Sequence, residues 1–189
     1  AIFTGDGDVQ HESVGPVAYW NRYVAVTEMG AHGKFSDTRT GLNVDNTGGG
    51  PDLVTDKLPA LQAYQFSLAA PQAQAGSFDA TAAARGKILF NNKAQCATCH
   101  SGPKFTDVTD GGKLHPQDAS VANDKDYVNR SATKQWRVTP LKGIWQHAPY
   151  FHDGSAATLS AVVDKYNASR NLGLTSQEKT DLTEYLKSL

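Results

Sequence analysis

The chain has two cysteines, Cys96 and Cys99, and His100 follows the second one directly. The spacing C-x-x-C-H is typical of a site where two thiols form thioethers to a haem and the histidine binds its iron. A redox dithiol would instead follow a thioredoxin-like strand, and a zinc site would need a second ligand pair, for which no cysteines remain. The sequence therefore favours one covalently bound haem c.

Composition limits the class of protein further. At 189 residues with 39% hydrophobic residues, the chain can bury a real core, and no segment approaches the length of a membrane span. Its net charge is −1 and no basic stripe stands out, which argues against a nucleic-acid partner. Covalent haem attachment takes place outside the cytoplasm, so we expect a periplasmic or otherwise exported protein whose leader has been removed.

Hydrophobic periodicity and turn residues divide the sequence into two parts, residues 1–79 and 80–189. The first part reads as a helical extension that ends in a small-residue linker at 69–77. We expect the second part to be one mainly α helical domain around the haem, with a polar loop over 101–135. Its segment GKILFNNKAQCATCH resembles the start of class I cytochromes c, which implies a cytochrome c-like domain. The expected helices cover residues 16–28, 52–68, 80–90, 158–167 and 174–189.

Two of these helices are expected to cross. The helix before the haem motif and the C-terminal helix would bury one haem edge if a small residue on one met an aromatic residue on the other. Gly86 and Tyr185 are the candidates. Thr175 and Glu178 form the pattern of a capping box, which predicts where the C-terminal helix begins.

The residue on the second face of the iron decides between electron transfer, catalysis and gas binding. The only methionine, Met29, lies upstream of the motif at the end of a helix, and core filling is its simpler interpretation. Tyr166 shares a helix face with Leu159, Val162 and Val163, and periodicity alone favours a core tyrosine. The other histidines are further candidates, each more simply a surface residue: His11, His32, His115, His147 and His152.

Two longer segments carry a family resemblance. RGKILFNNKAQCATCHSGPKFTD (85–107) and TPLKGIWQHAPYFHDGSAATLSAVVDKYN (139–167) resemble the C-terminal haem domain of bacterial di-haem cytochrome c peroxidases and the related methylamine dehydrogenase maturation enzyme. In the peroxidases, a methionine seven positions after the leucine of T-L-x-x-[AV]-V binds iron, and in the maturation enzyme a tyrosine does so. Counting from Leu159 gives Tyr166, so the resemblance implies a haem iron between His100 and Tyr166.

The chain also departs from this family. Its members carry two haems, and residues 1–79 contain no C-x-x-C-H motif. The site that reacts with peroxide in the family is therefore absent from this chain. The family also holds calcium between its domains through backbone carbonyls that match His147 and Pro149 here, but without the partner domain we do not expect calcium.

Three functions remain open. An exported mono-haem electron carrier serving a redox partner protein is favoured, and an anionic tyrosine ligand would stabilise ferric iron and lower the reduction potential. A peroxidase-like enzyme would need Tyr166 to leave the iron and an acid–base group such as His147 or His152 nearby. A haem-based sensor would likewise need a labile ligand.

Overall fold

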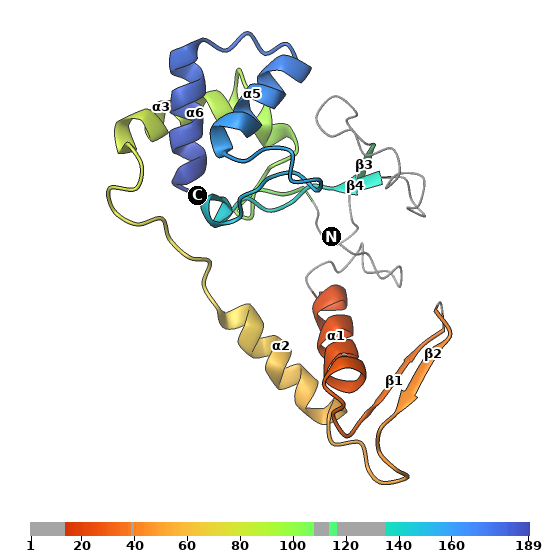
Figure 1. Cartoon of the computed structure of the whole chain (residues 1–189). Helices are drawn as coiled ribbons and strands as arrows, with labels where there is room; N and C mark the ends of the chain where they lie inside the picture. Colours follow the sequence, from red (N-terminus) through yellow and green to blue (C-terminus); the bar gives the residue numbers. More distant parts are fainter. Residues whose placement is uncertain (1–13, 39, 108–113, 117–134) are drawn as a thin grey trace. The chain divides into compact units, whose positions relative to one another are not determined.

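The computed structural model describes residues 14–38, 40–107, 114–116 and 135–189. Its contacts divide the chain into two compact units, and the described residues change unit between Ala69 and Ala70. Residues 70–79, assigned from sequence to the N-terminal part, cluster with the C-terminal unit. We describe each unit by itself (Figure 1).

The N-terminal unit combines helices with a hairpin. Helix α1 (Val14–Tyr23) continues into a π-helical turn at Val24–Glu28, where the sequence predicts one uninterrupted helix. Strands β1 (Lys34–Asp37) and β2 (Leu42–Asp45) pair in antiparallel register, an element that the sequence analysis does not predict. A 3-10 turn (Thr55–Lys57) then leads into α2 (Leu58–Ser67).

A small core holds this unit together. Val26, Phe35 and Val54 are its buried members. The Phe35 ring meets Tyr19 and Tyr23 edge to face, with centroids 5.4 Å away in each case. Met29 lies outside this core with 76% of its surface exposed, so the core-filling interpretation is wrong.

The C-terminal unit is built mainly of helices: α3 (Ala80–Asn91), α5 (Leu159–Ser169) and α6 (Ser176–Lys187). Strands β3 (Leu114–Pro116) and β4 (Gln135–Arg137) form a short antiparallel pair. Strand β3 lies within the segment 101–135 that was expected to be a loop, and β4 begins at the last residue of that segment. The buried core consists of Ala83, Phe90, Ala94, Leu141, Tyr150, Ala156, Leu159, Val163, Leu174, Leu182, Tyr185 and Leu186. This helix-rich unit agrees with the predicted cytochrome c-like class.

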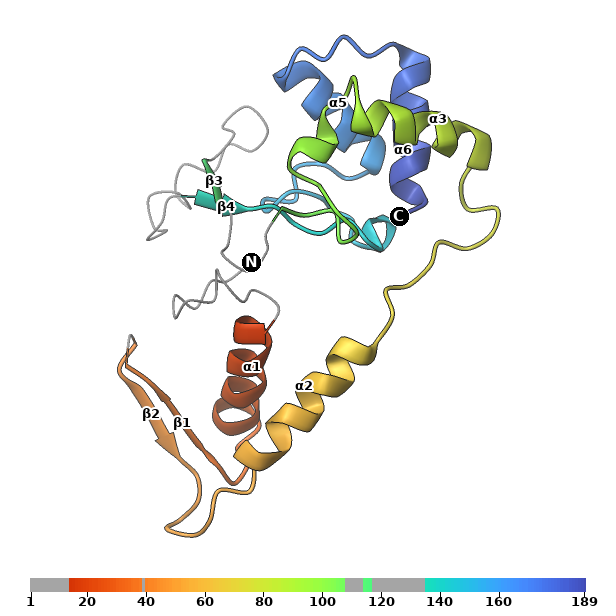
Figure 2. The ribbon, with the colours of Figure 1, turned by 180° about the vertical axis from the view of Figure 1, so that it is seen from behind.

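Helices α3 and α6 cross, as Figures 1 and 2 both show. At Gly86 a Cβ atom would lie only 2.0 Å from the carbonyl oxygen of Asp181 and 2.8 Å from the Cβ of Tyr185. The Phe90 ring meets the Tyr185 ring at 5.3 Å and 70° beside this contact. The predicted crossing through Gly86 and Tyr185 is confirmed, because no side chain larger than hydrogen fits there.

The predicted capping box at the start of α6 is also confirmed. The Thr175 hydroxyl accepts from the Glu178 amide at 3.2 Å, and the Glu178 carboxylate accepts from the Thr175 amide at 2.8 Å. Lys93, just after α3, pairs with the same carboxylate at 2.6 Å and so ties the two helices together. Among the described residues, no helix is both long and apolar enough to cross a lipid bilayer.

Candidate haem-binding site

The C-x-x-C-H motif folds into one tight turn. Residues Cys96–Thr98 form a 3-10 turn that begins five residues after α3 ends at Asn91. The amides of Cys99 and His100 both donate to the carbonyl of Cys96, at 3.3 and 2.9 Å. The turn therefore gathers the two free, partly buried thiols and the imidazole within one short stretch of backbone.

His100 is oriented by the loop that follows it. Its Nδ1 lies 3.0 Å from the carbonyl oxygen of Phe105, so Nδ1–H donates there and Nε2 keeps a lone pair for a metal. Burial lowers the pKa of His100, which favours the neutral form that binds metal ions. Phe105 itself has a φ of 56°, and this left-handed backbone turns its carbonyl toward the imidazole.

The Cys96 thiol does not have the electrostatics of a redox-active cysteine. Burial raises the pKa of Cys96 to about 11, against a smaller opposing effect of the Arg170 charge. Redox-active cysteines have lowered thiol pKa values, because neighbouring positive charges stabilise the thiolate. The environment of Cys96 thus disfavours the redox-dithiol interpretation and leaves thioether formation as the use that suits both cysteines.

Tyr166 lies in the same unit, on α5. Thr158 caps this helix, with its hydroxyl accepting from the Ala161 amide at 3.1 Å, and this sets the register that carries Tyr166. The partly buried Tyr166 ring contacts the Phe151 ring at a centroid distance of 5.8 Å. Its face lies under the Arg170 guanidinium, whose Cζ is 5.7 Å from the ring centroid.

Arg170, which lies over the Tyr166 ring, also has an electrostatic effect on the motif. Its positive charge contributes to lowering the pKa of His100, after the larger effect of burial, and it acts on Cys96 as well. Arg170 therefore contacts the Tyr166 ring and also acts electrostatically on the motif, while ligation of iron by Tyr166 stays a prediction. Neither Arg170 nor Phe105 was predicted from the sequence, although Phe105 contacts His100 and Arg170 contacts Tyr166.

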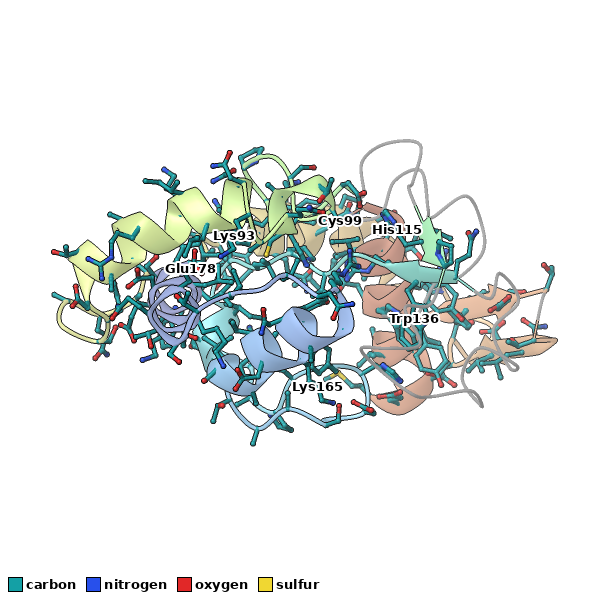
Figure 3. The ribbon with its side chains drawn as sticks, turned by 90° about the horizontal axis from the view of Figure 1, so that it is seen from above. Lys93, Cys99, His115, Trp136, Lys165 and Glu178 are labelled. Atoms are coloured by element: carbon teal, nitrogen blue, oxygen red, sulfur yellow. The ribbon has the colours of Figure 1, made fainter. Side chains whose placement is uncertain are left out.

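A third cluster borders the motif at Cys99. The Cys99 sulfur, an Asp107 carboxylate oxygen and a His115 ring nitrogen all lie within 4.8 Å of one another, and Figure 3 shows Cys99 and His115 close together. His115 Nε2 is 2.7 Å from Asp107 Oδ2. A thioether at Cys99 would remove its thiolate and leave a weaker sulfur donor, so haem attachment would weaken any joint binding of a metal ion by these three groups.

The remaining candidate ligands lie in less suitable places. His147 and His152 are exposed, and the His152 ring packs against Trp136 with centroids 4.3 Å apart. His32 is an exposed residue of the N-terminal unit. His11 lies outside the described residues.

These residues fit a covalently attached haem. The donor set combines two thiols on one turn with an imidazole whose Nδ1 is anchored, so Nε2 is the nitrogen that would bind iron. The fold and the site together define a cytochrome c-like haem domain.

Comparison with known proteins supports this class and narrows it. The RoxA-like, cytochrome c-like family model matches residues 136–171. The cytochrome-c peroxidase IdrP1 of Denitromonas iodatirespirans is 28% identical over 187 aligned residues, which cover 72% of this chain and 50% of the relative. The methylamine utilization protein MauG of Methylorubrum extorquens is 29% identical, over 57% of this chain and 34% of the relative.

A solved structure agrees in fold. The crystal structure of a MauG-like protein associated with microbial copper homeostasis superposes with a TM-score of 0.55 at 24% identity, covering 76% of this chain and 58% of that one. The predicted resemblance to di-haem peroxidases and MauG is confirmed. This chain spans half the length, or less, of the curated relatives described here.

Proposed function

We propose that this chain is an exported c-type cytochrome domain that binds one haem c and passes single electrons at low potential to a redox partner protein. Cys96 and Cys99 would hold the haem through thioethers, and His100 would bind its iron. Tyr166 would bind the opposite face. The observation that carries the proposal is the anchored imidazole of His100, whose Nδ1 lies 3.0 Å from the Phe105 carbonyl.

The chain's own residues would set the properties of the site. Bound haem supplies a one-electron ferric–ferrous couple. The hydrogen bond from His100 to the Phe105 carbonyl fixes the ring orientation and makes Nε2 a stronger donor. Tyr166, as an anionic ligand, would favour the ferric state and so lower the reduction potential.

A second candidate is a peroxidase-like haem enzyme. The observation in its favour is that matched relatives carry the name cytochrome-c peroxidase. This function would require Tyr166 to leave the iron so that peroxide could approach. The exposed residues His147 and His152 would then be the candidate acid–base groups.

Two measurements on the purified protein test these functions. Intact mass under denaturing conditions should exceed the chain mass by one haem, and the double variant Cys96→Ala/Cys99→Ala should lose this increment. Cyanide and peroxide should leave the optical spectrum of an electron carrier unchanged. Rapid peroxide turnover with an electron donor would instead establish the peroxidase-like function, and absence of covalent haem would overturn both.

A further inference from the structure

Arg170 occupies a defined place one helical turn after Tyr166. It forms the C-cap of α5, and its amide donates to the Tyr166 carbonyl at 3.0 Å. Residues four apart on a helix lie on the same side, so the guanidinium can cover the tyrosine ring. The distance of 5.7 Å from Cζ to the ring centroid is within the range of a cation–π contact.

We propose that Arg170 is a positioning residue that orients the Tyr166 ring and weakens its electron donation to the haem iron. The inference rests on the proposed ligation by His100 and Tyr166. A cation over an aromatic face attracts the electron density of that ring. A phenolate oxygen on such a ring donates less to ferric iron, so the reduction potential is less negative than Tyr166 alone would make it.

Substitution of Arg170 tests this role directly. In Arg170→Gln the reduction potential should fall, by about 59 mV if the ferric–ferrous equilibrium shifts about tenfold. The phenolate-to-iron charge-transfer band should move to longer wavelength, because a stronger donor needs less energy to transfer charge. Arg170→Lys keeps the positive charge and should recover part of both shifts. Arg170 is exposed, so these changes should leave the helical circular dichroism intact.

Lys165→Gln is the matched control. Lys165 also carries a positive charge on α5, but its Nζ lies over the Phe151 ring, 5.0 Å from the centroid. Figure 3 shows Lys165 and Cys99 on opposite sides of this helix. Removing this charge should leave the band and the potential unchanged. Equal shifts in Lys165→Gln and Arg170→Gln would show a general charge effect and overturn the proposal.

The Tyr166→Phe background separates failure of this inference from failure of the proposed ligation. Without the tyrosine oxygen, Arg170→Gln should have less than half of its original effect on the potential. An undiminished effect would mean that the cation acts on a haem propionate or on the iron, and would refute the role at Tyr166.

The single variants show which of the two claims fails. If Tyr166→Phe alters the ferric spectrum but Arg170→Gln alters neither the charge-transfer band nor the reduction potential, only the Arg170 inference fails. If Tyr166→Phe itself leaves the spectrum unchanged, the ligation fails first.

Discussion

Asp181 on α6 is a buried carboxylate held by three donors. Only 4% of its surface is exposed. Arg85 donates to it twice, from Nε at 2.7 Å and from Nη2 at 2.6 Å, and Gln177 donates at 2.9 Å. The hydrogen bonds from Arg85 hold the pKa of Asp181 below its ordinary value, because they favour the ionised form.

Replacement of this carboxylate should make stability depend less on pH. Asp181→Asn should lower the free energy of unfolding at neutral pH by about 1.5–3 kcal/mol, as for a lost hydrogen bond to a charged group. We expect the lower end, because the Arg85 side chain is 50% exposed and can be hydrated. Since the folded pKa is lowered, the wild-type advantage is present above about pH 3.9 and is lost as pH falls through the folded value. Urea unfolding at several pH values measures this, and a difference that stays constant down to pH 2 would contradict it.

Single residues of the site differ in how well the sequence predicts them. Cys96, Cys99 and His100 follow from spacing alone, because thioether attachment needs that pattern. Phe105 could not be found in this way, since phenylalanine rarely adopts the positive φ that turns its carbonyl to His100. Arg170 was missed because the helix was expected to end at residue 167, whereas α5 extends to Ser169.

At the scale of elements, the crossing of α3 and α6 is the contact that sequence predicts best. A glycine inside a helix reduces stability unless close packing requires it, so Gly86 indicated that another helix packs closely at this position. The structure explains it, because the backbone of Asp181 lies where a Cβ would be.

Gly86→Ala should therefore separate the two helices. The added methyl cannot be accommodated by rotation of a side chain, because the atom it meets is a backbone oxygen. We expect a loss of about 1–3 kcal/mol or more in the free energy of unfolding, typical of overpacking. Thermal or urea unfolding gives the measurement. Lys87→Ala, at the exposed next position of α3, is the control and should change stability by less than about 0.5 kcal/mol. Equal stability of both variants would contradict the close crossing.

The β1–β2 hairpin shows why a short element can escape prediction. Its first strand alternates exposed and buried residues, as a half-buried strand should. One of the two buried positions is Asp37, which accepts a hydrogen bond from the Tyr19 hydroxyl at 2.8 Å. A buried carboxylate breaks the hydrophobic alternation on which strand prediction depends, so no apolar pattern marks the strand.

At the scale of the whole chain, the sequence predicts the class of domain better than the function. The haem motif and the helical periodicity together predict a cytochrome c-like unit, and the resemblance to di-haem peroxidases and MauG is confirmed. The relatives are about twice as long or longer, so the activity of a whole relative cannot be transferred to this chain. The second axial ligand is the residue on which electron transfer and peroxidase-like chemistry differ.

The ferric optical and EPR spectra of the wild-type protein and of Tyr166→Phe test that ligand most directly. Tyr64→Phe provides the same chemical change at an exposed tyrosine on α2 and serves as the control. We predict six-coordinate, low-spin iron with a phenolate charge-transfer band in the wild type and in Tyr64→Phe, and loss of that band with altered coordination in Tyr166→Phe. Identical ferric spectra for all three proteins would make Tyr166 a core residue and contradict the proposed His100–Tyr166 site.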